Sequence, residues 1–168
     1  MEGLRGLLPP PHWDRQGSWS GTYGGLLLCD QTMTEGDITL ESVDYSPSVP
    51  AEQIRVFLRH VPPADERTGA QVLWTPDNGL LGTVRSLQED TLYGDFDDQI
   101  DGASIDLPCD PVDRDDPFLE LIFEVHASRS GADIPGFTIH YREGGEARQL
   151  QVDWEMIACG TDIREGVC

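Results

Sequence analysis

The amino-acid sequence predicts an all-β protein, an antiparallel β-sandwich of about seven to nine short strands. Apolar residues repeat with a period of two in several short runs, which is the pattern of half-buried strands. Turn-forming residues separate these runs, with 18 Gly and 12 Pro among 168 residues. No segment of ordinary helical length shows the helical period. A closed barrel is the alternative architecture.

The amino-terminal region is expected to be a lead or linker. Residues 1–20 show no steady period and contain a proline run at 9–11. We therefore assign them to a proline-containing linker and residues 21–168 to a single β-sandwich domain. Trp13 and Trp19 in this lead are expected to pack back onto the domain.

Several strand-like runs follow, joined by turn signals. Within residues 37–45 the alternation changes face after Leu40, as a β-bulge would cause. Within residues 53–61, Phe57 falls on an otherwise polar face, where it either begins a partner patch or is covered by the amino-terminal lead. A short helix over 84–92 is an option in the middle of the chain. The expected strands lie at residues 23–29, 37–45, 53–61, 71–75, 80–87 and 103–107.

The clearest strand signals lie in residues 118–159. A two-residue loop at Gly144 and Gly145, where glycine takes positive φ without steric cost, would set Ile139 opposite Leu150. The second strand of this hairpin alternates without interruption from 149 to 156. The run from residue 118 is expected to pair with the hairpin, which would complete a three-stranded antiparallel unit. The exposed face of the hairpin, which we expect to be ordinary sheet surface, carries Thr138, His140, Gln149 and Gln151.

The expected architecture is immunoglobulin-like in its layers, without the sequence hallmark of that family. Trp74 lies far from both Cys29 and Cys109, and no Tyr stands two residues before a Cys. The sequence therefore predicts the sandwich architecture and not membership of that family.

The four cysteines predict two disulfides. They are even in number and have no metal-binding spacing, although buried free thiols are the alternative. A bond between Cys159 and Cys168 would attach the end of the chain to the last strand and leave Cys29 for Cys109. The sequence alone allows all three pairings.

The charge balance is extreme and argues against a nucleic-acid ligand. The chain has 31 acidic and 11 basic residues, all of the latter Arg, and a net charge of −20. A phosphate backbone would be repelled by such a surface. No apolar run approaches the roughly 20 residues of a membrane span. The acidic side chains are expected to form a solvating surface.

Disulfides suggest an extracellular or cell-envelope location, yet the first residues show neither the apolar core nor the cleavage site of a signal peptide. We expect that a signal or membrane anchor has been lost upstream of the proline run. Reduced thiols are the other explanation of this conflict.

An acidic loop is the candidate metal site. Its aspartates precede Gly102 and resemble half of a calcium loop, because Ca²⁺ binds several carboxylate and carbonyl oxygens on flexible backbone. Pro108 stands where the helix-loop-helix calcium pattern needs a bidentate Glu, so a solvated loop is the stronger expectation. The candidate ligands are Asp95, Asp97, Asp98 and Asp101, which Asp110, Asp113, Asp115 and Asp116 could complete only if the fold brings the two groups together.

The sequence predicts no catalytic site and no resident cofactor. Glu124, His126 and His140 could meet across strands as a zinc or copper site, but a simple cross-strand Glu-His pair is the stronger expectation. The segment GSWSG has Trp19 where a nucleophile elbow needs its central Ser. Carboxylate pairs are too abundant in this chain to indicate a glycosidase.

Four segments carry a resemblance to known proteins: GLLLC, LPCD, the hairpin IHYREGGEARQLQV and the closing MIACGTDIREGVC, which together with their surroundings cover about half of the chain. In these segments the chain resembles uncharacterised actinobacterial secreted or membrane-anchored proteins with one small β-domain. The resemblance implies location and architecture only. We therefore expect a non-enzymatic extracellular or cell-envelope module that binds another protein or an envelope component, or that has a structural role. The alternatives are a calcium-dependent adhesion or binding domain and a small hydrolase with a carboxylate pair.

Overall fold

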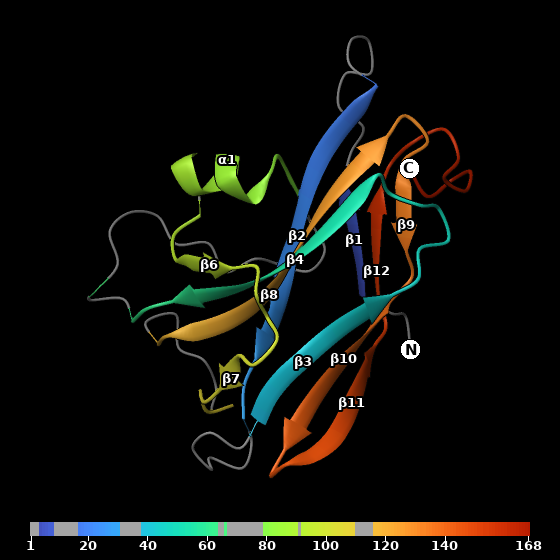
Figure 1. Cartoon of the computed structure of the whole chain (residues 1–168). Helices are drawn as coiled ribbons and strands as arrows, with labels where there is room; N and C mark the ends of the chain where they lie inside the picture. The colour runs from blue at the N-terminus through green and yellow to red at the C-terminus, as the bar shows by residue number, and fades with distance from the viewer. Residues whose placement is uncertain are drawn as a thin grey trace.

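The structure of the protein is a computed structural model, which describes residues 4–8, 17–30, 38–63, 66, 79–90, 92–109 and 116–168. In these residues the chain forms twelve strands and one short helix (Figure 1). The strand expected at 71–75 lies outside the described residues. The elements are β1 (Leu4–Leu8), β2 (Ser18–Leu28), β3 (Ile38–Tyr45), β4 (Gln53–Val61), β5 (Leu80–Leu81), α1 (Val84–Asp90), β6 (Asp95–Asp97), β7 (Ser104–Ile105), β8 (Phe118–Ser128), β9 (Ala132–Ile134), β10 (Phe137–Glu143), β11 (Glu146–Val152) and β12 (Trp154–Ala158).

The strands form three sheets around one main core, which confirms the all-β sandwich prediction. The largest sheet has the order β5-β2-β8-β4-β6, the second β11-β10-β3-β7, and the third β1-β12-β9. Aromatic residues from all three sheets meet between the layers. The ring centroids of Phe123 and Phe137 lie 4.6 Å apart, and Trp154 makes edge contacts with both rings. These contacts join the separate sheets into one hydrophobic core.

The hairpin of β10 and β11 has the predicted register. Ile139 pairs with Leu150, and the two-residue loop has positive φ at Gly144 and Gly145. The expected third strand was wrong, because β8 lies between β2 and β4 in the largest sheet, while the other neighbour of β10 is β3. The predicted bulge in β3 is present, since the register shifts opposite His140 and Tyr141.

The alternation from residue 149 to 156 does not form one continuous strand. It is interrupted at Asp153, where the chain passes from β11 in the second sheet to β12 in the third. Leu150 before the break is 51% exposed, whereas Trp154 after it is 1% exposed. Alternation identifies the two faces of each strand but not the layer to which the strand belongs.

The predicted lead contains a strand of the sandwich. Within residues 1–20, β1 pairs with β12 in parallel and β2 begins at Ser18. Leu8 at the end of β1 is fully buried, and it fits because Gly21 leaves room for it; a Cβ at Gly21 would collide with the Leu8 side chain. This parallel pair departs from the predicted all-antiparallel arrangement.

On the outer face of the largest sheet, α1 covers Phe57, which was expected to lie under the amino-terminal lead or in a partner patch. Phe57 of β4 and Ile122 of β8 pack with Val84, Leu87 and Leu92 in a second, smaller core. The short helix allowed by the sequence is therefore present, and the strand expected over 80–87 is reduced to β5. Figure 1 shows α1 standing off this face of the sheet.

The four cysteines form two disulfides, Cys29–Cys109 and Cys159–Cys168, as predicted. The first joins the end of β2 to the segment after β7, where Asp30 donates its N–H to Leu107 O at 2.7 Å. The second closes the last residues of the chain back onto the residue that follows β12.

Candidate functional site

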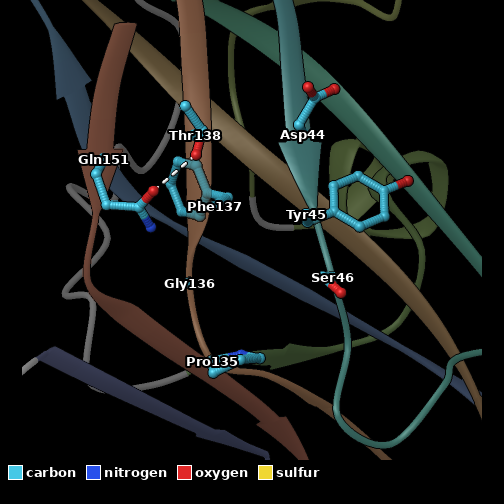
Figure 2. A pocket seen from close by; sticks show the side chains of 8 residues that line it. All are labelled: Asp44, Tyr45, Ser46, Pro135, Gly136, Phe137, Thr138 and Gln151. Atoms are coloured by element: carbon cyan, nitrogen blue, oxygen red, sulfur yellow. Dashed lines mark hydrogen bonds between the residues drawn. The ribbon is translucent and has the colours of Figure 1, made fainter.

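A depression lined by both polar and apolar residues lies where the ladder between β3 and β10 ends. It has a volume of about 410 Å³, within the range of small-molecule sites in proteins. Figure 2 shows Gln151 and Thr138 meeting at one side, Pro135 at one end, and Asp44 and Tyr45 on β3. The lining residues are Asp44, Tyr45, Ser46, Pro135, Gly136, Phe137, Thr138 and Gln151.

One cross-strand row forms the polar side of this depression. Thr138 on β10 pairs with Asp44 on β3 and with Gln151 on β11, so the three side chains stand on the outer face of the second sheet. The Thr138 hydroxyl donates a hydrogen bond of 2.7 Å to Gln151 Oε1. His140 Nε2 lies 3.0 Å from Asp44 Oδ2. The neighbouring side chains thus hold both the amide and the carboxylate in place.

The floor of the depression depends on the small size of Gly136. A Cβ at this position would lie 2.8 Å from the carbonyl oxygen of Val152 and 3.6 Å from Gln151 Nε2. Because Gly136, which directly precedes β10, has no side chain, the row of outward-facing groups on this strand ends at Thr138. The missing side chain creates a hollow in what would otherwise be a flat sheet surface.

Tyr45 is the fixed aromatic component of the site. Its ring makes an edge contact with Phe123, with centroids 6.4 Å apart, and its hydroxyl donates to Ile54 O at 3.4 Å. Burial raises the pKa of the Tyr45 hydroxyl, so the phenol stays neutral at physiological pH. The depression therefore combines a neutral aromatic group with fixed hydrogen-bonding groups.

The aspartates of the predicted calcium loop do not converge. Asp95 and Asp97 lie in β6, where Asp97 Oδ1 accepts the Gln99 N–H at 2.9 Å. Asp98 forms an ion pair of 2.8 Å with Arg55, and Asp101 follows in the turn after β6. Across the described ranges no group of three or more His, Cys, Asp or Glu side chains could hold a metal ion. Asp110, Asp113 and Asp115 lie outside the described residues.

The histidines of the possible zinc or copper site lie in different sheets. His126 is on β8 with Glu124, and its Nε2 lies 2.8 Å from Glu124 Oε1. His140 is on β10 and contacts Asp44 instead. The cross-strand Glu-His pair predicted between Glu124 and His140 is replaced by a pair within one strand, because β8 and β10 are not neighbours.

His126 also lies in a hydrogen-bonded chain with a serine and a glutamate. Ser20 Oγ lies 2.9 Å from His126 Nδ1, and Glu124 lies on the other ring nitrogen. The composition is that of a nucleophile, base and acid. However, Glu124 Oε2 also accepts a hydrogen bond of 2.6 Å from the Val84 N–H, and Glu124 Oε1 lies 3.7 Å from Arg55 Nη1, so the carboxylate does not serve His126 alone. We therefore interpret this hydrogen-bonded series of Ser20, His126 and Glu124 as a structural element that attaches α1 to the sheet.

Among the residues that the structure describes, the most deeply buried charged pair is Arg59 with Glu120. Arg59 Nη1 donates to Glu120 Oε2 at 2.8 Å, and both side chains are fully buried. Arg59 Nε donates to Tyr93 O, and Gly25 N–H donates to Glu120 Oε1. Burial raises the pKa of the Glu120 carboxyl, and the nearby Arg59 charge opposes that rise. The pair is surrounded by packed side chains and has a structural role.

The sequence predicted the Thr138–Gln151 side of the depression but assigned no function to it. The hairpin register places these two residues together, because each face of a two-residue hairpin is set by its loop. Asp44 joins them only through the pairing of β3 with β10, and those strands are far apart in the chain. The Gly136 residue before the hairpin was the available signal of a hollow.

No family model, curated protein or solved structure matches the chain. The fold and the site define the class, which is a disulfide-linked β-sandwich with a depression of mixed polar and apolar lining on one sheet. In the part of the chain that the structure describes, no helix is both long enough and apolar enough to cross a membrane.

Proposed function

We propose that the protein is a non-enzymatic binding or structural module that works outside the cytoplasm, in the extracellular space or the cell envelope. Its partner is another protein or a component of the envelope. The observation that carries this proposal is the pairing of all four cysteines in two disulfides. Disulfides form and persist in oxidising compartments and are rare in the cytosol.

The placement of the disulfides supports a module with a fixed surface. Each bond anchors a segment at the edge of the sandwich, one at the end of β2 and the other at the chain end after β12. The depression with Thr138 and Gln151 lies on strands, which hold a site more precisely than loops do. The net charge of −20 favours a neutral or basic partner over an anionic polymer.

Mass spectrometry of the protein purified without reductant tests the location. We expect a mass lower by four hydrogens than that of the reduced chain and no thiol that reacts with iodoacetamide. A natively folded protein with four alkylated cysteines, recovered from the cytoplasm of the producing cell, would contradict the proposal.

A fluorophosphonate probe tests whether Ser20 is a catalytic nucleophile. We expect no modification of Ser20, because Glu124 is engaged by the Val84 N–H and by Arg55 and does not serve His126 alone. Stoichiometric labelling of Ser20 in the folded protein, abolished by His126→Ala, would show a hydrolase instead.

A further inference from the structure

We propose that the depression between β3, β10 and β11 binds a neutral oligosaccharide. The inference rests on the proposed binding function and names the chemical class of its ligand. It follows from three properties of the depression, which are its hydrogen-bonding groups, its apolar walls and its charge. Each property is set by residues that the strand pairing holds in place.

The hydrogen-bonding groups match a hydroxyl-rich ligand. Because the Thr138 hydroxyl donates to Gln151 Oε1, the two N–H groups of the Gln151 amide are left for a ligand. Gln151 Nε2 lies above the floor, 3.6 Å from the point where a Cβ of Gly136 would be. Asp44 adds a carboxylate acceptor on the opposite strand. Sugar hydroxyls both donate and accept, so adjacent hydroxyls can satisfy an amide and a carboxylate at the same time.

The apolar walls match the C–H faces of a pyranose ring. Pro135, which is exposed, and the half-buried ring of Tyr45 border the depression, while the polar row stands along one side (Figure 2). Phe137 contributes to the lining although its side chain is only 2% exposed, because its ring packs in the core. A sugar has the same division, with an apolar face and a hydroxyl-bearing edge. Tyr45 loses little conformational entropy on binding, because Ile54 and Phe123 already restrain it.

The electrostatics exclude an anionic sugar and the strand geometry disfavours a peptide. An exposed Asp44 in a chain of net charge −20 repels carboxylates, sulfates and phosphates.

A peptide strand binds by extending a sheet edge, through unpaired backbone groups. The depression lies on the face of β10, which already pairs with β3 on one side and β11 on the other, whereas in the described residues the free edges of this sheet are the far sides of β11 and β7. Side chains and not backbone groups therefore make the contacts.

The test uses the intact, oxidised protein and ¹⁵N-¹H NMR titration with maltohexaose, cellohexaose, chitohexaose and mannohexaose. At least one should shift the amide resonances of Gly136, Thr138 and Gln151. For that sugar Gln151→Ala should weaken binding by roughly tenfold or more, because it removes the oriented donor. Gln149→Ala is the matched control, since Gln149 is exposed on the same strand and the same face but lies outside the depression. It should leave the affinity within about twofold.

The opposite results would overturn the inference. It fails if none of the four sugars shifts these resonances at about 20 mM, a concentration that detects even weak binding. It also fails if oligogalacturonate binds as well as the neutral sugars, if a decapeptide binds in the depression instead, or if Gln149→Ala weakens binding as much as Gln151→Ala does. The disulfide measurement on the same sample separates a failure of this inference from a failure of the proposed function. Free thiols would overturn the proposed location outside the cytoplasm, whereas the sugar titration would still report whether the depression binds an oligosaccharide.

Discussion

At the residue scale, the buried Arg59–Glu120 pair shows how a charged group is accommodated inside the largest sheet. Arg59 is enclosed by the rings of Phe96 and Phe118, with its guanidinium 5.8 and 5.7 Å from their centroids. Its Nη1 and Nε donate to Glu120 and to the carbonyl oxygen of Tyr93. Removing both ions from water is costly, so the pair is stable only because these bonds are made together.

Arg59→Met is expected to lower the free energy of unfolding by about 3–5 kcal/mol at pH 7, because it leaves Glu120 buried without its counter-charge. The double variant Arg59→Met with Glu120→Leu should recover much of that loss, since it removes both charges. Urea unfolding followed by Trp fluorescence measures the difference. If the double variant is as unstable as the single one, packing around Arg59 and not its charge explains the loss.

The pH dependence of the same carboxyl is a second prediction. Burial raises the pKa of Glu120 above its ordinary 4.5, so the folded protein binds this proton more tightly than the unfolded chain does. The contribution of Glu120 to stability is therefore complete below pH 4.5 and is lost as pH rises through the raised pKa. The free energy of unfolding of the wild type minus that of Glu120→Gln should fall as pH increases above 4.5. A difference that rises instead would mean that the attraction of Arg59 outweighs burial.

At the scale of elements, α1 depends on a carboxylate of the sheet beneath it. The helix covers Phe57 and Ile122 through Val84 and Leu87, and its first N–H is accepted by Glu124. A seven-residue helix is marginal on its own, so these contacts and not helix propensity stabilise it.

Glu124→Ala should cost about 1–3 kcal/mol in unfolding free energy, because it leaves the buried Val84 N–H without its acceptor. It should also speed amide hydrogen exchange selectively in α1. Glu41→Ala is the control, because its ion pair with Arg142 is solvent-exposed and should contribute about 1 kcal/mol or less. Equal losses from the two substitutions would refute the attachment of α1 through Glu124.

At the scale of the whole molecule, local patterns predicted the faces of strands but not their neighbours. The β10–β11 register followed from Gly144 and Gly145, because a two-residue loop allows only one alignment. The position of β8 between β2 and β4 could not be predicted from its sequence, because the alternation of a strand is the same whichever strand lies next to it. β1 was missed because the burial of its Leu8 depends on Gly21, which lies in another strand and gives no signal in the sequence around Leu8. The depression was missed because it also depends on a long-range contact: Asp44 reaches it only through the pairing of β3 with β10.

The two disulfides should differ in their contribution to the stability of the whole molecule. Cys29–Cys109 closes a loop of 80 residues and Cys159–Cys168 one of 9. If the disulfides act by restricting the unfolded chain, they contribute about 4.5 and about 2.5 kcal/mol respectively. The double substitution of Cys29 and Cys109 by Ser should therefore lower the free energy of unfolding more than the same substitution of Cys159 and Cys168. Urea titration of the two variants measures this order. A larger loss from the short loop would show that Cys159–Cys168 acts through native contacts at the end of β12 and not through chain entropy.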